Sequence, residues 1–477
     1  MVGDRSRRIA RSGDRTDRDA PDAGESRHHY RPIMHEDLRS AIDSLMPDLR
    51  NDLEALIRIP SVSSAHFDPL EVRRSAEKTA ELLEKAGFDE VRLLELDGAH
   101  PAVYGHLRGP EGAPTVVLYA HHDVQPAGDA AEWTVDPFEP MERNGRLYGR
   151  GSSDDKAGII VHIGAVRALG GDLPVTVKVF VEGEEEIGST HLDAFLDEYG
   201  ELLASDVIVI ADSSNWRVGE PALTTSLRGL VSVLVEVRTL AAGVHSGMFG
   251  GVIPDALTTL SRVLAGLHDA DGSVAVAGLV TGTTPELDLT EEELRSQAGA
   301  LESVEFIGTG SLTDRLWMKP AISVLALDAP AVDEAINQLV PVARAKVSMR
   351  IAPGQDAGAA MEALVAHIEQ QPAWGAQVTV TPHESGEAFA LSTDDVRVQA
   401  FSEAFADAWE RDVVEMGVGG SIPFVAAFSE AYPDAAILLT GVADPTSRPH
   451  GPDESLDLEE LRRGILAEAI ALRKLAS

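Results

Sequence analysis

Cysteine is absent from this chain of 477 residues. Its absence excludes disulfide bonds, thiol nucleophiles and metal sites with cysteine ligands. Any zinc that the chain binds must therefore be held by histidine, aspartate and glutamate. Long hydrophobic runs are also missing, since no apolar stretch reaches the roughly 18 residues that predict a membrane-spanning helix.

Basic residues are few compared with acidic ones. The chain has 40 lysines and arginines against 78 aspartates and glutamates, which gives a formal net charge of −38 at pH 7. Such a chain repels nucleic acid and anionic membranes, so we expect neither as a partner. Most of this charge is typical of a solvated surface, and a smaller part of it is available for metal ligands.

The first 33 residues differ in composition from the rest of the chain. They are rich in arginine, aspartate, serine and glycine, and they show almost no apolar periodicity, which is typical of disorder. They also lack the apolar segment of a secretory signal. A helical pattern follows Met34, so we expect residues 1–33 to be a disordered tail and Met34 to be the start of the native protein.

Much of the remaining chain alternates between predicted helices and short apolar runs that predict buried strands. Thr115–Ala120 is apolar throughout, as in a strand covered on both faces, and Val175–Val181 and Val207–Ile210 are similar. Histidine, aspartate or glutamate follows each run within two residues. In open α/β sheets, residues beyond the carboxyl ends of neighbouring strands form sites.

The pattern changes near residue 221. Leu230–Val237 and Val342–Ile351 alternate like strands with one exposed face, and helical segments lie between them, which indicates an α+β arrangement. The α/β pattern resumes after about residue 388, and two domains suit this length. We therefore expect an α/β domain with a mixed, mostly parallel sheet, interrupted by an inserted α+β domain. The expected ranges are 34–220 and 388–477 for the α/β domain and 221–387 for the insertion.

Several residues at predicted strand ends or in loops could ligate metal. They offer the nitrogen and carboxylate ligands of catalytic zinc, and a carboxylate can bridge two ions. Glu185, beside Glu186, fits the need for an unligated carboxylate that takes a proton from water. Adjacent side chains of an extended segment point apart, so a turn must follow the strand here. The candidate ligands are His121, Asp154, Glu186, Asp212 and His450.

Each of these signals has an ordinary structural explanation when it is taken alone. A histidine after a buried strand usually has a structural role, and a run of glutamates is usually a solvated face. Asp154 and Asp155 could simply cap the helix that follows them. These explanations predict no coordination among distant segments, so the occurrence of all the motifs in one chain favours a metal site.

Three motifs resemble those of a known family. His121–Pro126 resembles its H-x-D-V-x-P, Tyr148–Lys156 its Y-G-R-G-(S/A)-x-D-D-K, and Glu182–Ser189 its E-G-x-E-E-x-G-S. The family is that of the aminoacylase/carboxypeptidase/carnosinase-like metallopeptidases, and the resemblance runs from about Leu38 to the end of the chain. It implies that the α/β domain is catalytic and binds two divalent metal ions. Zn²⁺ is favoured, with Mn²⁺ and Co²⁺ as alternatives.

The resemblance also implies a role for each candidate. Asp123 would hydrogen-bond the far nitrogen of His121 and fix its tautomer. Glu185 would be the general base that activates water and then protonates the leaving amine, whereas His122 and Glu184 are expected to be bystanders. One metal would be held by His121 and Asp212 and the other by Glu186 and His450, with Asp154 bridging both.

The inserted domain carries two further matches. Val244–Gly251 resembles H-S-G-x-x-G-G, whose histidine reaches the partner subunit's active site and helps to stabilise the oxyanion. This implies such a role for His245, in a homodimer formed through the dimerisation (lid) domain at 221–387. Ser348–Pro353 resembles S-x-R-x-x-P and implies that Arg350 binds a substrate carboxylate, although a lone arginine is also an ordinary edge-strand charge.

Gly419–Pro423 matches the G-G-S-I-P loop of the dipeptidase branch of this family. The match implies that Gly420 and Ser421 hold a carboxylate. That branch often has a basic residue two positions before the first glycine, and Gly417 stands there in this chain. This departure leaves open how the C-terminal carboxylate of a peptide is held.

The leading interpretation is a cytoplasmic, dimeric dipeptidase that hydrolyses dipeptides. An N-acyl-amino-acid deacylase or a carboxypeptidase would use the same site, since only the substrate pocket separates these activities. A third interpretation is a module in which the metals only brace the fold, and it predicts that Glu185 is dispensable.

Overall fold

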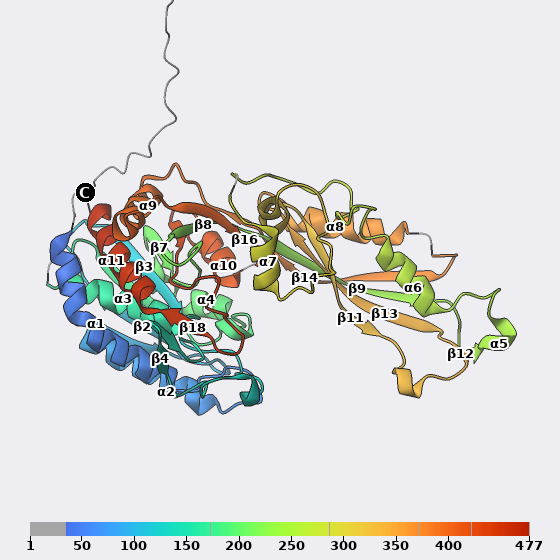
Figure 1. The fold of residues 1–477 in the computed structure, drawn as a ribbon, viewed down its shortest axis with the longest axis horizontal. Helices are drawn as coiled ribbons and strands as arrows, with labels where there is room; N and C mark the ends of the chain where they lie inside the picture. Colours follow the sequence, from blue (N-terminus) through green and yellow to red (C-terminus); the bar gives the residue numbers. More distant parts are fainter. Residues whose placement is uncertain (1–34, 172, 286, 372, 421, 477) are drawn as a thin grey trace, which may run out of the picture. The chain divides into compact units, whose positions relative to one another are not determined.

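The computed structural model describes residues 35–476, apart from Asp172, Glu286, Pro372 and Ser421. The predictions for residues 1–33 and for Met34 therefore lie outside the described range. Within that range, the chain builds one large and one smaller sheet, together with two minor ones (Figure 1). No described helix is both long and apolar enough to span a membrane.

The large sheet has nine strands in the order β1-β2-β6-β3-β7-β17-β8-β15, with β16 beside β8. Its four central strands are parallel: β6 (Thr176–Glu182), β3 (Thr115–His121), β7 (Val207–Ile210) and β17 (Ala436–Leu439). Antiparallel pairing adds strands at both sides, so the mixed sheet that was predicted is confirmed. The flanking strands are β1 (Glu90–Leu94), β2 (Ala102–Leu107), β8 (Ala222–Leu227), β15 (Phe389–Ala390) and β16 (Val414–Val418).

The central strands are apolar on both faces because helices cover both faces. In β3, Val116 and Leu118 belong to one hydrophobic cluster, whereas Val117 and Tyr119 belong to another. This division follows from the alternation of side chains along a strand. The first cluster includes α1 (Glu36–Ile57), α2 (Pro69–Lys85), α3 (Lys156–Leu169), α9 (Val396–Trp409) and α11 (Leu458–Leu475), and the second includes α4 (Leu192–Leu203) and α10 (Pro423–Ala431).

The smaller sheet is antiparallel, in the order β11-β13-β9-β14. Alternate valines of β9, from Val231 to Val237, are fully buried, as the sequence pattern predicts for a strand with one covered face. The helices α6 (Ala256–Ala265) and α8 (Ala357–Glu369) share their hydrophobic cluster. The strands are β9 (Gly229–Arg238), β11 (Ala321–Asp328), β13 (Val342–Ile351) and β14 (Gln377–Gly386).

Short elements complete the described chain, and α7 (Glu291–Ala298) lies in the long segment between α6 and β11. The other short strands and helix are β4 (Met141–Arg143), β5 (Arg146–Tyr148), β10 (Val244–His245), α5 (Ser246–Phe249), β12 (Gln338–Leu339) and β18 (Ser455–Asp457). Single helical turns occur at Ala130–Glu132, Glu185–Ile187, Asp314–Met318 and Val332–Glu334.

One strand changes the expected start of the insertion. β8 lies inside the range 221–387, yet it pairs with β17 and β16 of the large sheet. Its residues Thr224, Thr225 and Ser226 are polar, so it lacks the apolar run that marks the other inner strands. We therefore propose that the insertion begins after β8, near Gly229.

Candidate active site

The carboxyl ends of three neighbouring strands bring the candidate ligands together. β3 lies between β6 and β7 and runs parallel to both, so these three strands end at the same edge of the sheet. β3 ends at His121, which is paired with Glu182 at the end of β6. Asp212 stands two residues beyond the end of β7. These candidate residues therefore lie at the carboxyl ends of neighbouring strands, where the sequence pattern predicted them.

Six predicted residues form one cluster. Ligand atoms of His121, Asp154 and Glu186 lie within 4.8 Å of one another, and so do those of His121, Glu185 and Asp212. His450 joins the first group, with its Nε2 3.0 Å from Asp154 Oδ2 and 3.1 Å from Glu186 Oε2. The cluster thus contains every expected metal ligand together with the expected general base.

Asp154 lies between the two histidines of this cluster. Its Oδ1 is 3.0 Å from His121 Nε2, and its Oδ2 is 3.0 Å from His450 Nε2. Each carboxylate oxygen therefore faces a different histidine, which is the arrangement that a bridging carboxylate needs. The alternative role as a helix cap does not apply, because the capping position of α3 is Asp155 and its side chain makes no capping hydrogen bond.

Asp123 is placed to orient His121. Its Oδ1 lies 3.4 Å from His121 Nδ1, and its main-chain carbonyl lies 3.1 Å from the same nitrogen. These acceptors favour a proton on Nδ1 and leave Nε2 to face Asp154. Asp123 Oδ2 also accepts a hydrogen bond from the main-chain N–H of Glu186 at 3.1 Å. One buried carboxylate thus orients two of the candidate ligands.

The predicted turn after β6 separates the three consecutive glutamates. A helical turn at Glu185–Ile187 follows the strand, and Gly188 closes it with a φ of 83°. Glu185 and Glu186 belong to the cluster, whereas Glu184 is buried elsewhere. Glu184 accepts hydrogen bonds from the main-chain N–H of His100 at 2.8 Å and of His191 at 3.2 Å. Glu184 therefore lies outside the cluster and holds two loops through their main-chain N–H groups.

His122 is a structural residue, as expected. Its buried ring places Nε2 2.9 Å from the carbonyl of Pro101, and burial lowers its pKa to about 4. The ring is therefore neutral at physiological pH and points away from the candidate ligands.

The electrostatics of the cluster suit divalent cations. Burial, with a contribution from the nearby Asp154 carboxylate, raises the pKa of Asp212 to about 7. Burial also raises the pKa of Glu185 well above its usual value, and the charges of Asp212 and Glu186 add to the effect. Cations would relieve this repulsion, and the mixed imidazole and carboxylate donors match Zn²⁺, Mn²⁺ or Co²⁺. The residues thus fit a site for two metal ions.

Comparison with known families identifies the chain. Residues 117–474, well over half of its length, match the model of the peptidase family M20/M25/M40. The chain belongs to this family. The resemblance predicted from the three motifs is confirmed, as is the expectation that the chain is a peptidase.

Known members of the M20 family resemble the chain over nearly their full length. A cysteinylglycine-S-conjugate dipeptidase of Corynebacterium striatum is 35% identical over 437 residues, which cover 89% of this chain and 96% of the relative. The solved structure of Dug1p from Saccharomyces cerevisiae has a TM-score of 0.75 at 24% identity, covering 92% of this chain and 98% of that one. Human carnosine dipeptidase 1 has the same TM-score and identity, covering 93% and 99%. At this identity the two structures show the fold alone.

Sequence reasoning missed two buried glutamates that support the candidate site, and the first is Glu454. Its fully buried Oε2 accepts hydrogen bonds from Arg150 Nη1 at 2.7 Å and from the N–H of Gly151 at 3.0 Å. Its Oε1 accepts from the N–H of Ser153 at 2.9 Å and from that of Asp154 at 3.2 Å. Glu454 thus holds the loop that carries Asp154. Nothing in the sequence distinguishes it from the many surface glutamates.

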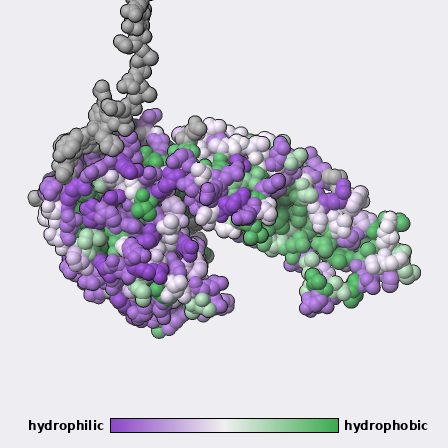
Figure 2. Space-filling model, in the orientation of Figure 1, coloured by the Kyte–Doolittle hydropathy of each residue, from purple (hydrophilic) through white to green (hydrophobic). Residues whose placement is uncertain are grey.

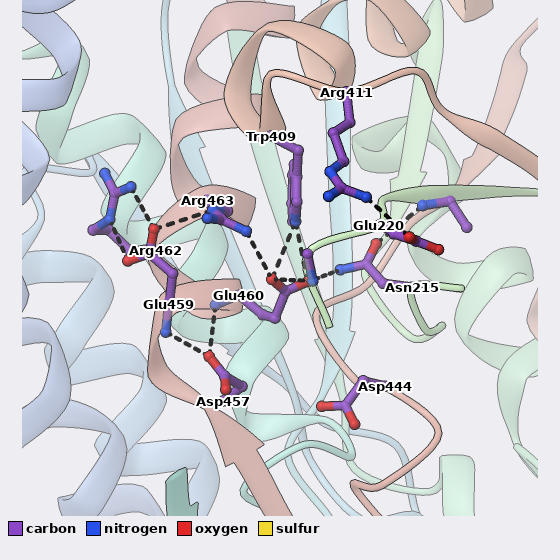
Figure 3. A network of polar contacts seen from close by, with 12 residues as sticks. Asn215, Glu220, Trp409, Arg411, Asp444, Asp457, Glu459, Glu460, Arg462 and Arg463 are labelled. Carbon is purple, nitrogen blue, oxygen red and sulfur yellow. Dashed lines mark hydrogen bonds and ion pairs between the residues drawn. The ribbon is translucent and has the colours of Figure 1, made fainter. Parts of the chain in front are cut away.

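A second buried glutamate, Glu460 of α11, holds the loop that follows Asp212 (Figure 3). Its Oε2 accepts a hydrogen bond from Asn215 Nδ2 at 2.8 Å, and its carboxylate also accepts from Trp409 Nε1 at 3.1 Å. The main-chain N–H of Asn215 donates to the carbonyl of Ala443 at 2.8 Å. The loop that follows Asp212 and the loop that leads to His450 are therefore bound to each other, and Glu460 binds the first of them to the helical layer.

Three described residues that were predicted to contact the substrate lie outside the two groups of candidate metal ligands: His245 and Arg350 in the insertion, and Gly420 in the α/β domain. His245 is exposed on β10, and its Nδ1 accepts a hydrogen bond from the N–H of Gly247 at 3.0 Å. Arg350 is half-buried on β13, opposite Leu230 of β9. Gly420 follows β16, and Ser421 is not among the described residues.

Proposed function

We propose that this M20 peptidase is a dipeptidase that depends on two divalent metal ions, with Zn²⁺ favoured over Mn²⁺ and Co²⁺. The names of its relatives, a cysteinylglycine-S-conjugate dipeptidase among them, support a dipeptide substrate. The observation that carries the metal assignment is the Asp154 carboxylate, whose two oxygens face His121 and His450 at 3.0 Å each. A cytoplasmic location is part of the proposal and rests on the resemblance of the motifs.

Asp154 would bridge the two ions, and the other candidate ligands would divide between them. His121 and Asp212 would hold one ion, and Glu186 and His450 the other. Bound ions supply Lewis acidity toward the scissile carbonyl and the attacking water. Glu185 lies beside His121 and Asp212, where its carboxylate takes the proton of the attacking water and passes it to the leaving amine. Burial raises the pKa of Glu185 well above its usual value, which suits a carboxyl group that must donate a proton after it has accepted one.

The insertion and the Gly419–Pro423 loop of the α/β domain supply the remaining groups of the proposed site. Arg350, together with the Gly420 N–H and Ser421, would hold the carboxylate of the substrate. His245 would donate a hydrogen bond to the developing oxyanion. Its exposed position, outside both groups of candidate metal ligands, supports a role in the active site of a partner subunit.

Exposed hydrophobic residues in the insertion support a homodimer formed through 221–387. Met248 is 74% exposed and Val252 is 85% exposed, and both lie close to His245 in the sequence. On β11, an edge strand of the smaller sheet, Leu325 is 59% exposed and Leu327 is 46% exposed. Figure 2 shows hydrophobic residues gathered on the visible face over this sheet. Unpaired, apolar sheet edges of this kind favour association.

Metal analysis and a substrate panel test the proposal. We expect about two divalent ions per chain, in line with two-metal peptidase sites. We also expect hydrolysis of Cys-Gly, Ala-Ala or β-Ala-His to exceed that of N-acetyl amino acids. A preference for the N-acetyl compounds would instead identify a deacylase, and longer peptides cleaved at the C-terminus would identify a carboxypeptidase.

The variant Glu185→Gln tests the proton transfer. The amide cannot take a proton from water, so we expect kcat to fall by about 10²–10⁴-fold while both metals stay bound. Glu201→Gln, an exposed position on α4, is the matched control and should keep full activity. Hydrolysis that persists in a fully metallated Glu185→Gln variant would overturn this mechanism.

A further inference from the structure

Arg228 and Arg350 come close together where the chain passes from the large sheet into the smaller one. Arg350 pairs with Leu230 in the β13–β9 register, and Arg228 precedes Leu230 by two residues. In an extended chain, residues two apart share one face, and diagonal neighbours across strands lie about 7–8 Å apart. The proximity has an electrostatic consequence, because burial and the charge of Arg350 together lower the pKa of Arg228 to about 10.

The guanidinium of Arg228 is held in place without being neutralised. Its Nε donates to the carbonyl of Gly419 at 3.1 Å, and its Nη1 donates to that of Lys319 at 3.4 Å. Among the residues that the structure describes, no carboxylate contacts it. A half-buried cation beside a second cation is costly unless an anion is bound. This part of the site therefore favours a negatively charged ligand.

Two glycines, Gly417 in β16 and Gly419 just after it, determine which cation reaches the Gly419–Gly420 turn. A Cβ at Gly417 would lie 2.7 Å from Trp317 Cβ, so this position has no room for the basic side chain that the dipeptidase branch often carries. A Cβ at Gly419 would lie 2.7 Å from Arg228 Nη2. The missing side chain at Gly419 thus lets the guanidinium of Arg228 lie against the turn. The cation beside this turn is therefore Arg228, since a basic side chain does not fit at position 417.

The elements that carry this turn border the metal-ligand cluster. Phe424 lies on α10, four residues after Gly420, and its ring centroid is 3.6 Å from that of Tyr119. Tyr119 stands two residues before His121 on β3. On β8, the strand that leads to Arg228, Thr224 Oγ1 lies 2.6 Å from the hydroxyl of Ser213, the residue next to Asp212. Through α10 and β8, the turn and Arg228 are therefore connected to the edge of the large sheet where the candidate ligands meet.

We propose that Arg228 determines specificity by binding, together with Arg350, the C-terminal carboxylate of the dipeptide. This inference rests on the proposed dipeptidase function. A guanidinium held by main-chain carbonyls is preorganised, and guanidinium–carboxylate hydrogen bonds are among the stronger ones in proteins. The substrate class is then a peptide whose free carboxylate lies one residue beyond the scissile bond, and neutralising that carboxylate should weaken binding.

The test compares Ala-Ala with its C-terminal amide in the metallated enzyme. Arg228→Met keeps the length of the side chain and removes its charge. We expect kcat/KM for Ala-Ala to fall about tenfold or more, mainly through KM, because a charge-assisted contact is lost. The value for the amide should change less than about twofold, since it has no charge to pair. Arg315→Met is the matched control, because Arg315 also donates to main-chain carbonyls, those of Ile307 and Gly308.

The outcomes separate this inference from the function on which it rests. Equal losses for Ala-Ala and the amide, or no loss for either, would overturn the role of Arg228. If Arg228→Met does not fold, Arg228→Lys carries the test: it keeps the charge but loses the planar donor pair, so its preference for Ala-Ala over the amide must be smaller than that of the wild type. Failure of the wild-type enzyme to cleave any dipeptide would instead refute the proposed function.

Discussion

Asp154 and His450 face each other although they stand 296 positions apart in the sequence. Glu454 connects their two loops, since it follows His450 by four residues and accepts the N–H of Asp154. Every described partner of its carboxylate is a donor, from the guanidinium of Arg150 to the hydroxyl of Ser153. An ionised carboxylate satisfies such a ring of donors, and an amide does not.

We therefore predict that Glu454→Gln weakens metal binding by about 10–100-fold, as losses of groups that orient metal ligands commonly do. The amide nitrogen would face N–H donors and displace the loop that carries Asp154. The measurement is the dissociation constant for Zn²⁺, obtained by competition with a chelator of known affinity. Thermal unfolding of the metal-free protein, measured in parallel, reports the loss of stability separately.

Glu468→Gln is the matched control for this prediction. Glu468 is also a buried glutamate, and it pairs with His162 at 2.8 Å instead of with a ligand loop. We expect the control to lose stability and to keep the wild-type affinity for Zn²⁺. Equal affinities in both variants would mean that Glu454 supports only the fold.

At the scale of elements, the packing of α11 sets the position of the loop that leads to His450. Gly464 of α11 lies against Val442, just beyond the end of β17, and a Cβ at this glycine would overlap Val442 Cγ1. Gly164 of α3 is similarly close to Ile465, so α3 and α11 approach each other through small residues. The sheet and these helices thus fix both ends of the segment between β17 and β18.

We predict that Gly464→Ala destabilises the protein by about 1–3 kcal/mol relative to Gly200→Ala, because overpacking a close contact has a cost of this size. Both positions are helical, so the gain in helix propensity cancels in the comparison. A Cβ at Gly200 would meet only Tyr432 Oη at an ordinary 3.4 Å. Chemical unfolding of the metal-free variants measures the difference, and equal stabilities would show that α11 can shift without cost.

The helices and central strands could be predicted because each repeats a local pattern. β3, β6 and β7 lie within about one residue of their predicted ranges, since burial on both faces requires apolar residues throughout. β8 could not be assigned in this way: it reaches an inner position of the sheet with polar residues such as Thr224, whose hydroxyl has a partner in Ser213. Because a hydrogen-bonded polar side chain can be buried, an inner strand that contains such residues shows no apolar run in the sequence.

The candidate ligands could also be predicted, whereas the residues that support them could not. His121, Asp154 and Glu186 stand in three motifs, and the occurrence of these motifs in this order along one chain is enough to indicate a metal site. Glu454 and Glu460 act through main-chain groups and side chains that are distant in the sequence, so their role exists only in the folded chain. In a chain with 78 acidic residues, nothing local separates them from the solvated majority.

At the scale of the whole molecule, a net charge of −38 opposes association, so a dimer must be stabilised by a strongly apolar interface. The exposed Met248, Val252 and Leu325 offer such a surface within the insertion. Because like charges repel less in salt, we expect dimerisation to strengthen as ionic strength rises. Sedimentation at several salt concentrations measures this, and a monomer under all conditions would contradict the proposed dimer.

Complementation between two inactive variants tests whether the partner subunit completes the site. His245→Ala keeps Glu185, and Glu185→Gln keeps His245, so a mixed dimer contains one site with both residues if His245 acts across the interface. Random pairing makes half of the dimers mixed, each with one intact site of two, so activity should recover to about a quarter of the wild-type value. The two variants are mixed after dissociation and reassociation, and each alone serves as the control. If His245 acts within its own subunit, every site lacks one residue and mixing restores nothing.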